Sequence, residues 1–284
     1  MNGSYDSQGR GSTLSKVRIL TRKDVGRGAF KRRVRPEQLK KGIYLLPSLF
    51  TTGNLFCGFF SIVSTFNGQY LQGAILIILA HLLDSLDGTV ARLTMTTSQF
   101  GIEYDSLADL VSFGVAPAML AYHWALSPWG TWGWLAACLY VVCGALRLAR
   151  FNVQIKSVEK SHFVGLPIPA AAEMIVSIVL MYHFFGGAAA THRQIISLLV
   201  IYGLAALMVS NFQYFSLKQL ALKKRRPFWI LLSAILLITL GIAEPQIMLF
   251  STSLLYTLSG PLLFLLTMRQ RWRERGGGIA ENLR

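Results

Sequence analysis

Long apolar stretches, separated by short polar breaks, follow one another from about residue 46 to residue 267. Each stretch is close to the ~20 residues that a helix needs to cross the hydrocarbon core of a bilayer. Turn-forming residues fill the breaks, as in Asn67-Gly68-Gln69 and in Ser127-Pro128-Trp129-Gly130. The pattern predicts an all-α polytopic membrane protein. Its eight predicted spans cover residues 46–66, 71–91, 106–126, 131–150, 168–186, 194–214, 228–244 and 246–267.

The segments outside the spans are polar and basic. Residues 1–35 lack the apolar core of a signal peptide, and we expect them to form a disordered cytoplasmic tail. Pro36 followed by Glu37 favours the start of a short juxtamembrane helix. The chain is therefore divided into six segments. They are a basic tail (1–35), a juxtamembrane helix (36–45), a catalytic transmembrane core (46–215), a basic loop (216–227), two additional transmembrane helices (228–268) and a second basic tail (269–284).

The composition excludes a soluble domain. Hydrophobic residues make up 53% of the chain and charged residues only 14%, whereas a soluble domain carries about 25% charged residues. The mean hydropathy is +0.46. The three cysteines form neither a CxxC pair nor a cluster with histidine, which argues against a disulfide framework and against a zinc site.

The formal net charge of +15 has its explanation in membrane topology. If the chain has eight spans, 27 of its 28 Lys and Arg residues lie on one side of the membrane, and only Arg193 lies on the other. Cytoplasmic loops carry the excess of Lys and Arg, so we predict that both termini are cytoplasmic in an inner-membrane protein. This removes the need for a nucleic-acid partner. The basic tail is expected to contact anionic membrane lipids.

Carboxylates inside the apolar spans indicate a functional site. Asp84 and Asp87 fall in the second span, and Asp105 and Asp109 fall at the start of the third. A carboxylate in a span is costly and by default marks function. At about 100° per residue, Asp84 and Asp87 share one face of their helix, and Asp105 and Asp109 share one face of theirs. The loop between the helices is short, so we expect antiparallel neighbours whose aspartates converge at the cytoplasmic end.

Converging carboxylates repel one another unless cations lie between them. Ligand sets made only of oxygen favour Mg²⁺ or Mn²⁺. Two such ions suit displacement at phosphorus, where they contact the attacking and the leaving oxygen. The residues alone thus predict a metal-dependent membrane enzyme that acts on phosphate. The alternative is an aspartate chain for proton or cation transport, which explains the clustering at one end less well.

The residues of this region form a spaced motif of eight specified positions. It reads Asp84-x2-Asp87-Gly88-x2-Ala91-Arg92-x8-Gly101-x3-Asp105-x3-Asp109. The motif resembles the signature of the CDP-alcohol phosphatidyltransferase family. The resemblance implies a six-helix catalytic core, here followed by two extra spans. It also implies transfer of a substituted phosphoryl group from a CDP-linked donor to an alcohol, with release of CMP.

The resemblance also implies roles for the residues of the motif. The four aspartates would hold two divalent ions on the donor pyrophosphate, and Asp109 would be the general base. The CDP-binding set would comprise Asn54, Gly88, Ala91, Arg92 and Gly101. In that set Arg92 would contact phosphate, and the small residues would make room for the cytidine part. Asn54, in the first span, either bonds the nucleotide or ties helices together.

Segments outside the motif narrow the choice of the acceptor alcohol. The stretches Pro47 to Gly58, Leu146 to Asn152 and Phe163 to Pro169 are similar to the integral-membrane phosphatidylserine synthases. This resemblance implies CDP-diacylglycerol as donor, L-serine as acceptor and a homodimer. Serine carries a carboxylate, and an arginine fork suits a carboxylate. We therefore expect the acceptor site at Arg147, Arg150 and Asn152.

Some alternatives stay open at this stage. The acceptor could be another alcohol, such as glycerol 3-phosphate, inositol phosphate or choline. Arg147 and Arg150 could also reflect only the excess of basic residues on the cytoplasmic side. His81 is expected to pack or to support the metal ligands, and Glu173 either to pair with an arginine or to be protonated.

Overall fold

The computed structural model describes most of the chain from the first span onward, and it is all-helical apart from one pair of two-residue strands. The described residues are 36–94, 98–155, 163–187, 190–214, 243–281 and the single positions 235, 239 and 241. The prediction for a span at 228–244 falls mostly outside them, as do the predictions for 1–35 and 216–227.

The helices follow one another along the chain with short connections. They are α1 (Pro36–Phe66), α2 (Tyr70–Thr94), α3 (Gln99–Asp109), the π-helical η1 (Leu110–Val115), α4 (Ala116–Ala121), the π-helical η2 (Tyr122–Leu126), the 3₁₀ turn η3 (Ser127–Trp129), α5 (Thr131–Ile155), α6 (Ile168–Phe184), α7 (Ala190–Val209) and α9 (Pro245–Glu281). The segments from α3 to η3 form one continuous apolar rod.

The membrane character of the chain is confirmed. Within the described residues, five helical segments are long and apolar enough to cross a bilayer. They are Ser48–Phe66, Tyr70–Ala91, Gln99–Trp129, Thr131–Val153 and Pro245–Leu266. The predicted fifth and sixth spans correspond to shorter apolar helices, Ile168–Phe184 and Arg193–Val209. The structure therefore supports a polytopic membrane protein with at least five spans, and the count of eight stays a prediction.

Three helix boundaries differ from the predicted ones. The segment 36–45 is not a separate helix, because α1 continues without a break from Pro36 to Phe66. The third span begins at Gln99 rather than 106, since the Ser98 side chain caps the helix by accepting from the Gly101 N–H at 3.0 Å. Finally, α9 continues through most of the predicted tail at 269–284.

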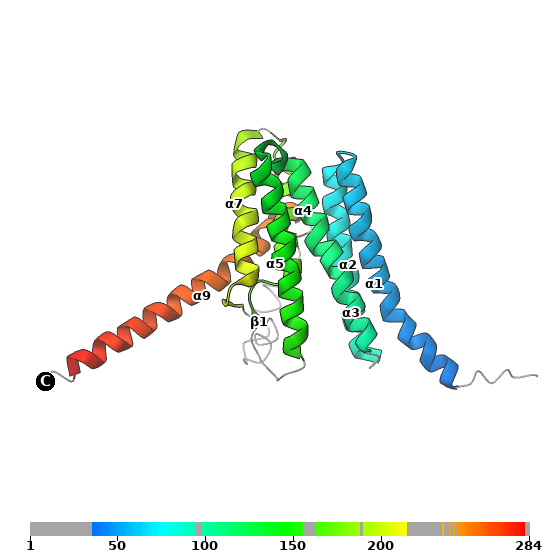
Figure 1. The fold of residues 1–284 in the computed structure, drawn as a ribbon, viewed down its shortest axis with the longest axis horizontal. Coiled ribbons are helices and arrows are strands. Elements are labelled where there is room, and N and C mark those ends of the chain that lie inside the picture. The colour runs from blue at the N-terminus through cyan, green and yellow to red at the C-terminus, as the bar shows by residue number, and fades with distance from the viewer. Residues whose placement is uncertain are drawn as a thin grey trace, which may run out of the picture.

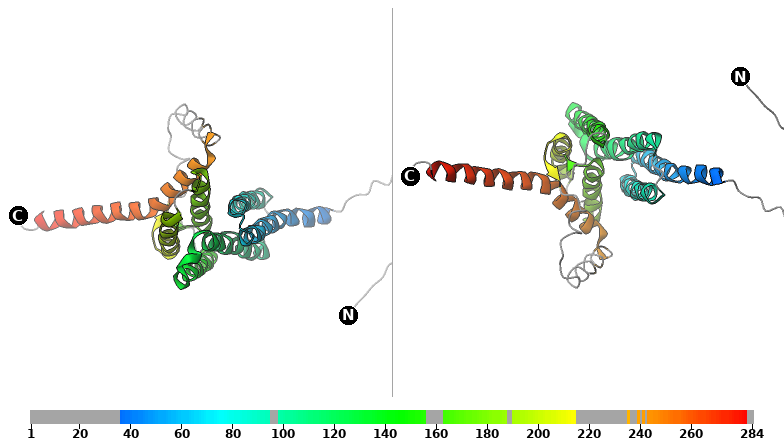
Figure 2. Two further views of the ribbon diagram at one scale, coloured as in Figure 1. Left: turned by 90° about the horizontal axis from the view of Figure 1, so that it is seen from above. Right: turned by 90° about the horizontal axis from the view of Figure 1, so that it is seen from below.

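The helices form a bundle in which α1 and α2 pack tightly as an antiparallel hairpin (Figure 1). Seen along the bundle, α1, α2 and the rod that starts with α3 lie on one side, and α5, α6 and α7 lie on the other (Figure 2). α9 packs on α6 and then extends away from the bundle. The two strands, β1 (Phe163–Val164) and β2 (Gln213–Tyr214), pair antiparallel and join the segments that follow α5 and α7.

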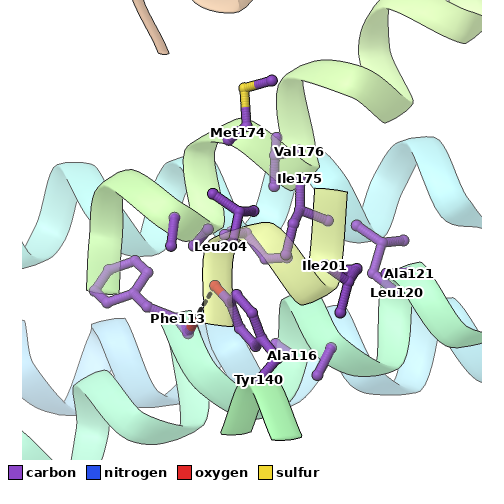
Figure 3. Packing of buried hydrophobic residues seen from close by; sticks show 14 of the residues in the cluster. Phe113, Ala116, Leu120, Ala121, Tyr140, Met174, Ile175, Val176, Ile201 and Leu204 are labelled. Carbon is purple, nitrogen blue, oxygen red and sulfur yellow. Dashed lines mark hydrogen bonds between the residues drawn. The ribbon is translucent and has the colours of Figure 1, made fainter. Parts of the chain in front are cut away.

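The core lies where α4 and η1 meet α5, α6 and α7 (Figure 3). Small residues let the helices approach closely, and larger ones fill the spaces between them. The π-helical turn η1 interrupts the regular helical ladder, and the Tyr140 hydroxyl donates to the freed Phe113 carbonyl at 3.1 Å. This rigid core supports the end of α3, which carries two of the predicted site residues.

Candidate active site

The structure brings three of the four motif aspartates together. Asp84 lies on α2, and Asp105 and Asp109 lie on α3; each offers a carboxylate oxygen, and these oxygens lie within 4.8 Å of one another. The predicted convergence of the two pairs is therefore present for these three residues. Asp87 does not belong to this group, although its side chain is buried next to it, at 5% exposure.

Helix α1 supports the aspartates from one side. The Thr51 hydroxyl donates to Asp87 Oδ2 at 2.6 Å, and the Asn54 side-chain amide donates to Asp109 Oδ1 at 3.1 Å. Both side chains are buried, and Asn54 is fully so. The two residues are three apart and therefore share one face of α1. α1 thus fixes one carboxylate on α2 and one on α3.

α2 packs against the rod that α3 begins, at η1 and α4, so the antiparallel neighbours predicted from the short loop are confirmed. α1 in turn packs against both α2 and α3. At the level of α3, the carboxylates of the two helices face each other, with α1 as the common support. Because carboxylates repel one another, a cation between them would stabilise this arrangement.

Asn54 occupies a more central place than a nucleotide contact alone requires. Its backbone carbonyl accepts from the Ser112 hydroxyl at 2.9 Å, and its side-chain Oδ1 is buried without a partner among the described residues. Gly58 lies one turn further along α1 and leaves the space that Ser112 fills. Asn54 therefore ties α1 to the rod, which was the alternative left open by the sequence.

The remaining motif positions surround the carboxylates. A Cβ atom added at Gly88 would meet no atom within 4 Å, so α2 has open space at this point. Gly101 lies at the start of α3, where its N–H is capped by Ser98. Ala91 lies in α2 and is partly buried. Arg92 also lies in α2, but its side chain is outside the described part of the structure.

The three residues predicted to bind the acceptor contact different elements. Arg147 is 6% exposed, and its Nε has no hydrogen-bond partner among the described residues. The Arg150 guanidinium donates to Asn211 Oδ1 at 2.9 Å, beyond the end of α7. The Asn152 amide donates to the Ser106 hydroxyl at 2.9 Å, directly next to Asp105. Asn152 is thus the member of the set that the structure links to the aspartate helix.

Glu173 has a different partner from the expected arginine. Its Oε1 lies 2.9 Å from His81 Nδ1, which connects α6 to α2 one turn before Asp84. Of the two alternatives for Glu173, the pairing with an arginine is not found, because no arginine side chain of the described residues lies within ion-pair distance of it. The contact agrees with the expectation that His81 packs beside the aspartates or supports them.

Sequence reasoning missed several polar residues of the site. Ser112, Ser106 and Asn211 each bond to a residue that had been singled out, and Tyr104 lies 3.0 Å from Thr52 through their hydroxyl oxygens. The sequence carried only a weak signal for these residues. Serine is common in membrane helices, and its spacing from the motif does not reveal which distant helix it meets.

The carboxylate group fits a divalent cation. Asp105 Oδ1 is buried and has no hydrogen-bond partner among the described residues. A buried carboxylate oxygen without a donor is costly unless a cation compensates it. The ligand atoms are all oxygens, which favours Mg²⁺ or Mn²⁺ over zinc. The residues present therefore match the metal-dependent chemistry inferred from the motif.

Comparisons with known proteins point in the same direction. Residues 44–210 match the model of the CDP-alcohol phosphatidyltransferase family. The chain is 44% identical over 180 residues to a CDP-diacylglycerol–serine O-phosphatidyltransferase of Helicobacter pylori, covering 62% of this chain and 74% of the relative. It is 37% identical over 169 residues to the enzyme of the same name from Bacillus subtilis, covering 60% of this chain and 89% of that relative.

An archaeal protein with a different name is also similar. The archaetidylserine synthase of Methanothermobacter thermautotrophicus is 38% identical over 171 residues, covering 60% of this chain and 69% of the relative. The family match includes the aspartate group and most of the supporting network on α1, α2, α3 and α5. The chain belongs to the CDP-alcohol phosphatidyltransferase family.

Proposed function

We propose that this protein transfers the phosphatidyl group of CDP-diacylglycerol to L-serine, giving phosphatidylserine and CMP. The observation that carries the proposal is the group of three converging carboxylates within the family-matched segment, with oxygens within 4.8 Å of one another. The names of the similar bacterial enzymes support serine as the acceptor and CDP-diacylglycerol as the donor. The name of the archaeal relative, archaetidylserine synthase, also refers to a serine lipid.

The reaction assigns a role to each aspartate. The serine hydroxyl attacks the β-phosphorus of the donor, the bond from that phosphorus to CMP breaks, and the hydroxyl proton moves to Asp109. Asn54 holds Asp109 Oδ1 at 3.1 Å, and this bond would orient the carboxylate toward the hydroxyl. Asp84, Asp87 and Asp105 would hold divalent ions together with Asp109. Two bound Mg²⁺ or Mn²⁺ ions would neutralise the pyrophosphate charge and make CMP a better leaving group.

The donor head group is proposed to lie along α2. Gly88 leaves open space there, Ala91 is small, and Gly101 lies at the start of α3 across from them. Arg92 would contact phosphate. The acyl chains would stay in the bilayer beside the bundle, since donor and product are both membrane lipids.

The acceptor is proposed to bind between α3 and α5. Asn152 already reaches Ser106 on α3, and the buried Arg147 supplies a positive charge that the serine carboxylate can neutralise. Arg150 adds a second positive charge at this end of α5, where Asn211 holds it. A zwitterion suits such a place, because its ammonium group can face the aspartates while its carboxylate faces the arginines.

Topology and assembly complete the proposal. The six-helix core would comprise α1, α2, the rod from α3 to η3, α5, α6 and α7, with 228–268 adding two spans. Both termini and the active site would face the cytoplasm, which follows from the distribution of Lys and Arg. The protein would function as a homodimer in the inner membrane, with basic tails at 1–35 and 269–284 and a basic loop at 216–227.

An acceptor panel tests the proposal. Purified protein would receive CDP-diacylglycerol, Mg²⁺ or Mn²⁺, and in turn serine, glycerol 3-phosphate, inositol phosphate or choline, with CMP release as the readout. Asp109→Asn should abolish release. Glu103→Gln is the matched control, because Glu103 is an exposed carboxylate on the same helix and its side chain accepts from Gln99 at 2.7 Å. This variant should keep nearly full activity.

Each outcome has a clear meaning. Release with serine alone supports the whole proposal. Release with another alcohol keeps the metal site but overturns the acceptor and the roles of Arg147 and Arg150. If folded, metal-loaded protein releases no CMP with any alcohol, the hypothesis of a phosphatidyltransferase is overturned and ion transport is favoured.

A further inference from the structure

An apolar groove begins at the end of the bundle far from the aspartates and runs along α6 as far as Met174. It is a groove of about 480 Å³ between η2, α6, α7 and α9. This volume is within the ~300–1,000 Å³ of sites that hold small molecules. Its lining is almost entirely apolar and includes Ile178, Met181, Ile196, Val200 and Phe250. The groove therefore suits a hydrocarbon chain.

One charged residue lines the groove. The Arg193 guanidinium lies 5.4 Å from the ring centre of Trp124 and 5.2 Å from that of Tyr182, which hold it between them. Its Nε is buried and has no hydrogen-bond partner among the described residues, and no described carboxylate lies within ion-pair distance. A cation held by two rings beside an apolar groove, without an anion among the described residues, is complementary to an amphiphilic anion.

The Arg193 end of the groove is remote from the proposed reaction site. The Tyr70 hydroxyl bonds the His123 carbonyl at this end of the bundle, and Asp84 lies 14 residues further along the same helix. That separation corresponds to roughly 21 Å along the helix axis. The exposed tryptophans of this end, Trp129, Trp132 and Trp134, are typical of a membrane–water interface. A lipid head group at the interface would thus be level with Arg193.

We propose that this groove binds an anionic phospholipid of the leaflet opposite the aspartates. Its phosphate contacts Arg193, and one acyl chain lies along α6 and α7 against Ile178 and Ile196. The occupant is a phospholipid rather than a protein segment because the groove combines an interfacial cation with a hydrocarbon-like lining, which matches a lipid's division into head and chain. The lipid stabilises the junction between α6, α7 and α9, and this role does not depend on the identity of the acceptor alcohol.

Site-directed photolabelling tests the proposal. The full chain, in mixed micelles, would receive a phosphatidylglycerol with a diazirine on one acyl chain, and labelled peptides would be mapped by mass spectrometry. We expect labels on α6 and α7 at the groove. Unlabelled phosphatidylglycerol should displace them about fivefold more effectively than phosphatidylcholine, the effect of one well-placed basic charge.

Four variants separate charge from shape. Arg193→Gln should remove the preference for the anionic lipid, and Arg193→Lys should keep most of it. Ile196→Trp should fill the groove and remove the label. Leu199→Trp is the matched control on the same helix, because Leu199 is 67% exposed and does not line the groove; it should label as the wild type does.

Three outcomes would overturn the proposal. One is a groove label that both lipids displace equally, and a second is a preference that survives in Arg193→Gln. The third is efficient crosslinking between two copies through Ile196→Cys without lipid labelling, which would make a second copy the occupant. Melting curves of all four variants identify any loss of label that comes from unfolding.

Discussion

Gly58 is the position where a single methyl group should test the packing that supports the site. A Cβ atom added there would lie 2.7 Å from Ser112 Cα and 2.9 Å from Ser112 Cβ, whereas ordinary contacts begin at 3.4 Å. The obstacle includes backbone, so a side-chain rotation cannot relieve it. Gly58→Ala should therefore push α1 and η1 apart by about 0.7 Å.

This displacement is large enough to break the network one turn away. The bond from Asn54 to Asp109 is 3.1 Å long, and 0.7 Å more takes it beyond hydrogen-bond range. Overpacking costs about 1–3 kcal/mol, and the lost buried bond adds about 1 kcal/mol. The better helix propensity of alanine offsets about 1 kcal/mol. The net loss in the free energy of unfolding should be about 1–3 kcal/mol.

The assay compares melting midpoints and CMP release in detergent or nanodiscs. We expect the midpoint of Gly58→Ala to fall by roughly 3–9 °C. Release should fall on the order of 10–100-fold, because displacement of a catalytic carboxylate by nearly 1 Å has effects of this size. Gly203→Ala is the matched control, since a Cβ atom there meets nothing within 4 Å. Ser112→Ala removes one bond without a clash and should have an intermediate effect. An unchanged midpoint and rate in Gly58→Ala would refute the close packing of α1 on η1.

Three further predictions concern the metal and the turn after α5. Chelation of divalent cations should abolish CMP release, and readdition of Mg²⁺ or Mn²⁺ should restore it. CMP release that persists at full chelation would refute the hypothesis that the reaction depends on a divalent metal. Thr51→Val removes the 2.6 Å bond to Asp87 and should raise the metal concentration for half-maximal release about 10–100-fold, measured by Mg²⁺ titration; an unchanged titration would mean that this bond does not orient a ligand. Gly165→Ala should lower the free energy of unfolding by about 2–4 kcal/mol in thermal melts, because φ is +83° and its Cβ would lie 2.5 Å from the Met208 carbonyl. Gly68→Ala is the control, because Gly68 has a φ of +77° but a Cβ atom there would meet no atom within 4 Å; it should lower the free energy of unfolding by only about 1 kcal/mol. Equal losses in the two variants would show that backbone strain, rather than the contact with Met208, causes the loss at Gly165.

Hydropathy predicted the spans well where a helix is apolar along its whole length. The second and fourth spans agree with Tyr70–Ala91 and Thr131–Val153 within a few residues. Hydropathy failed at the start of the third, because Gln99 to Asp105 is polar but still helical. A local signal was present, since Ser98 is a favourable N-cap, but a search for apolar stretches gives such residues no weight.

The candidate site was predictable as a set of residues but not as a network. Helical spacing shows that Asp105 and Asp109 share a face, and it shows the same for Thr51 and Asn54 on α1. It does not show which helix each face meets. That depends on the close approach of α1 to the rod at Gly58, which is a tertiary contact between residues 54 apart in sequence. The motif therefore predicted the carboxylates, and only the structure revealed that α1 holds them.

The proposed acceptor residues show the same limit more sharply. Arg147, Arg150 and Asn152 are close in sequence, yet at about 100° per residue they point in directions about 0°, 300° and 140° around α5. They meet three different surroundings: the buried side of the bundle, Asn211 after α7, and Ser106 on α3. A serine bound between α3 and α5 could therefore reach Asn152 directly, whereas Arg150 would first have to release Asn211. Of the two arginines, the buried Arg147 is then the stronger partner for a carboxylate, because its charge has no described anion nearby and is shielded from water.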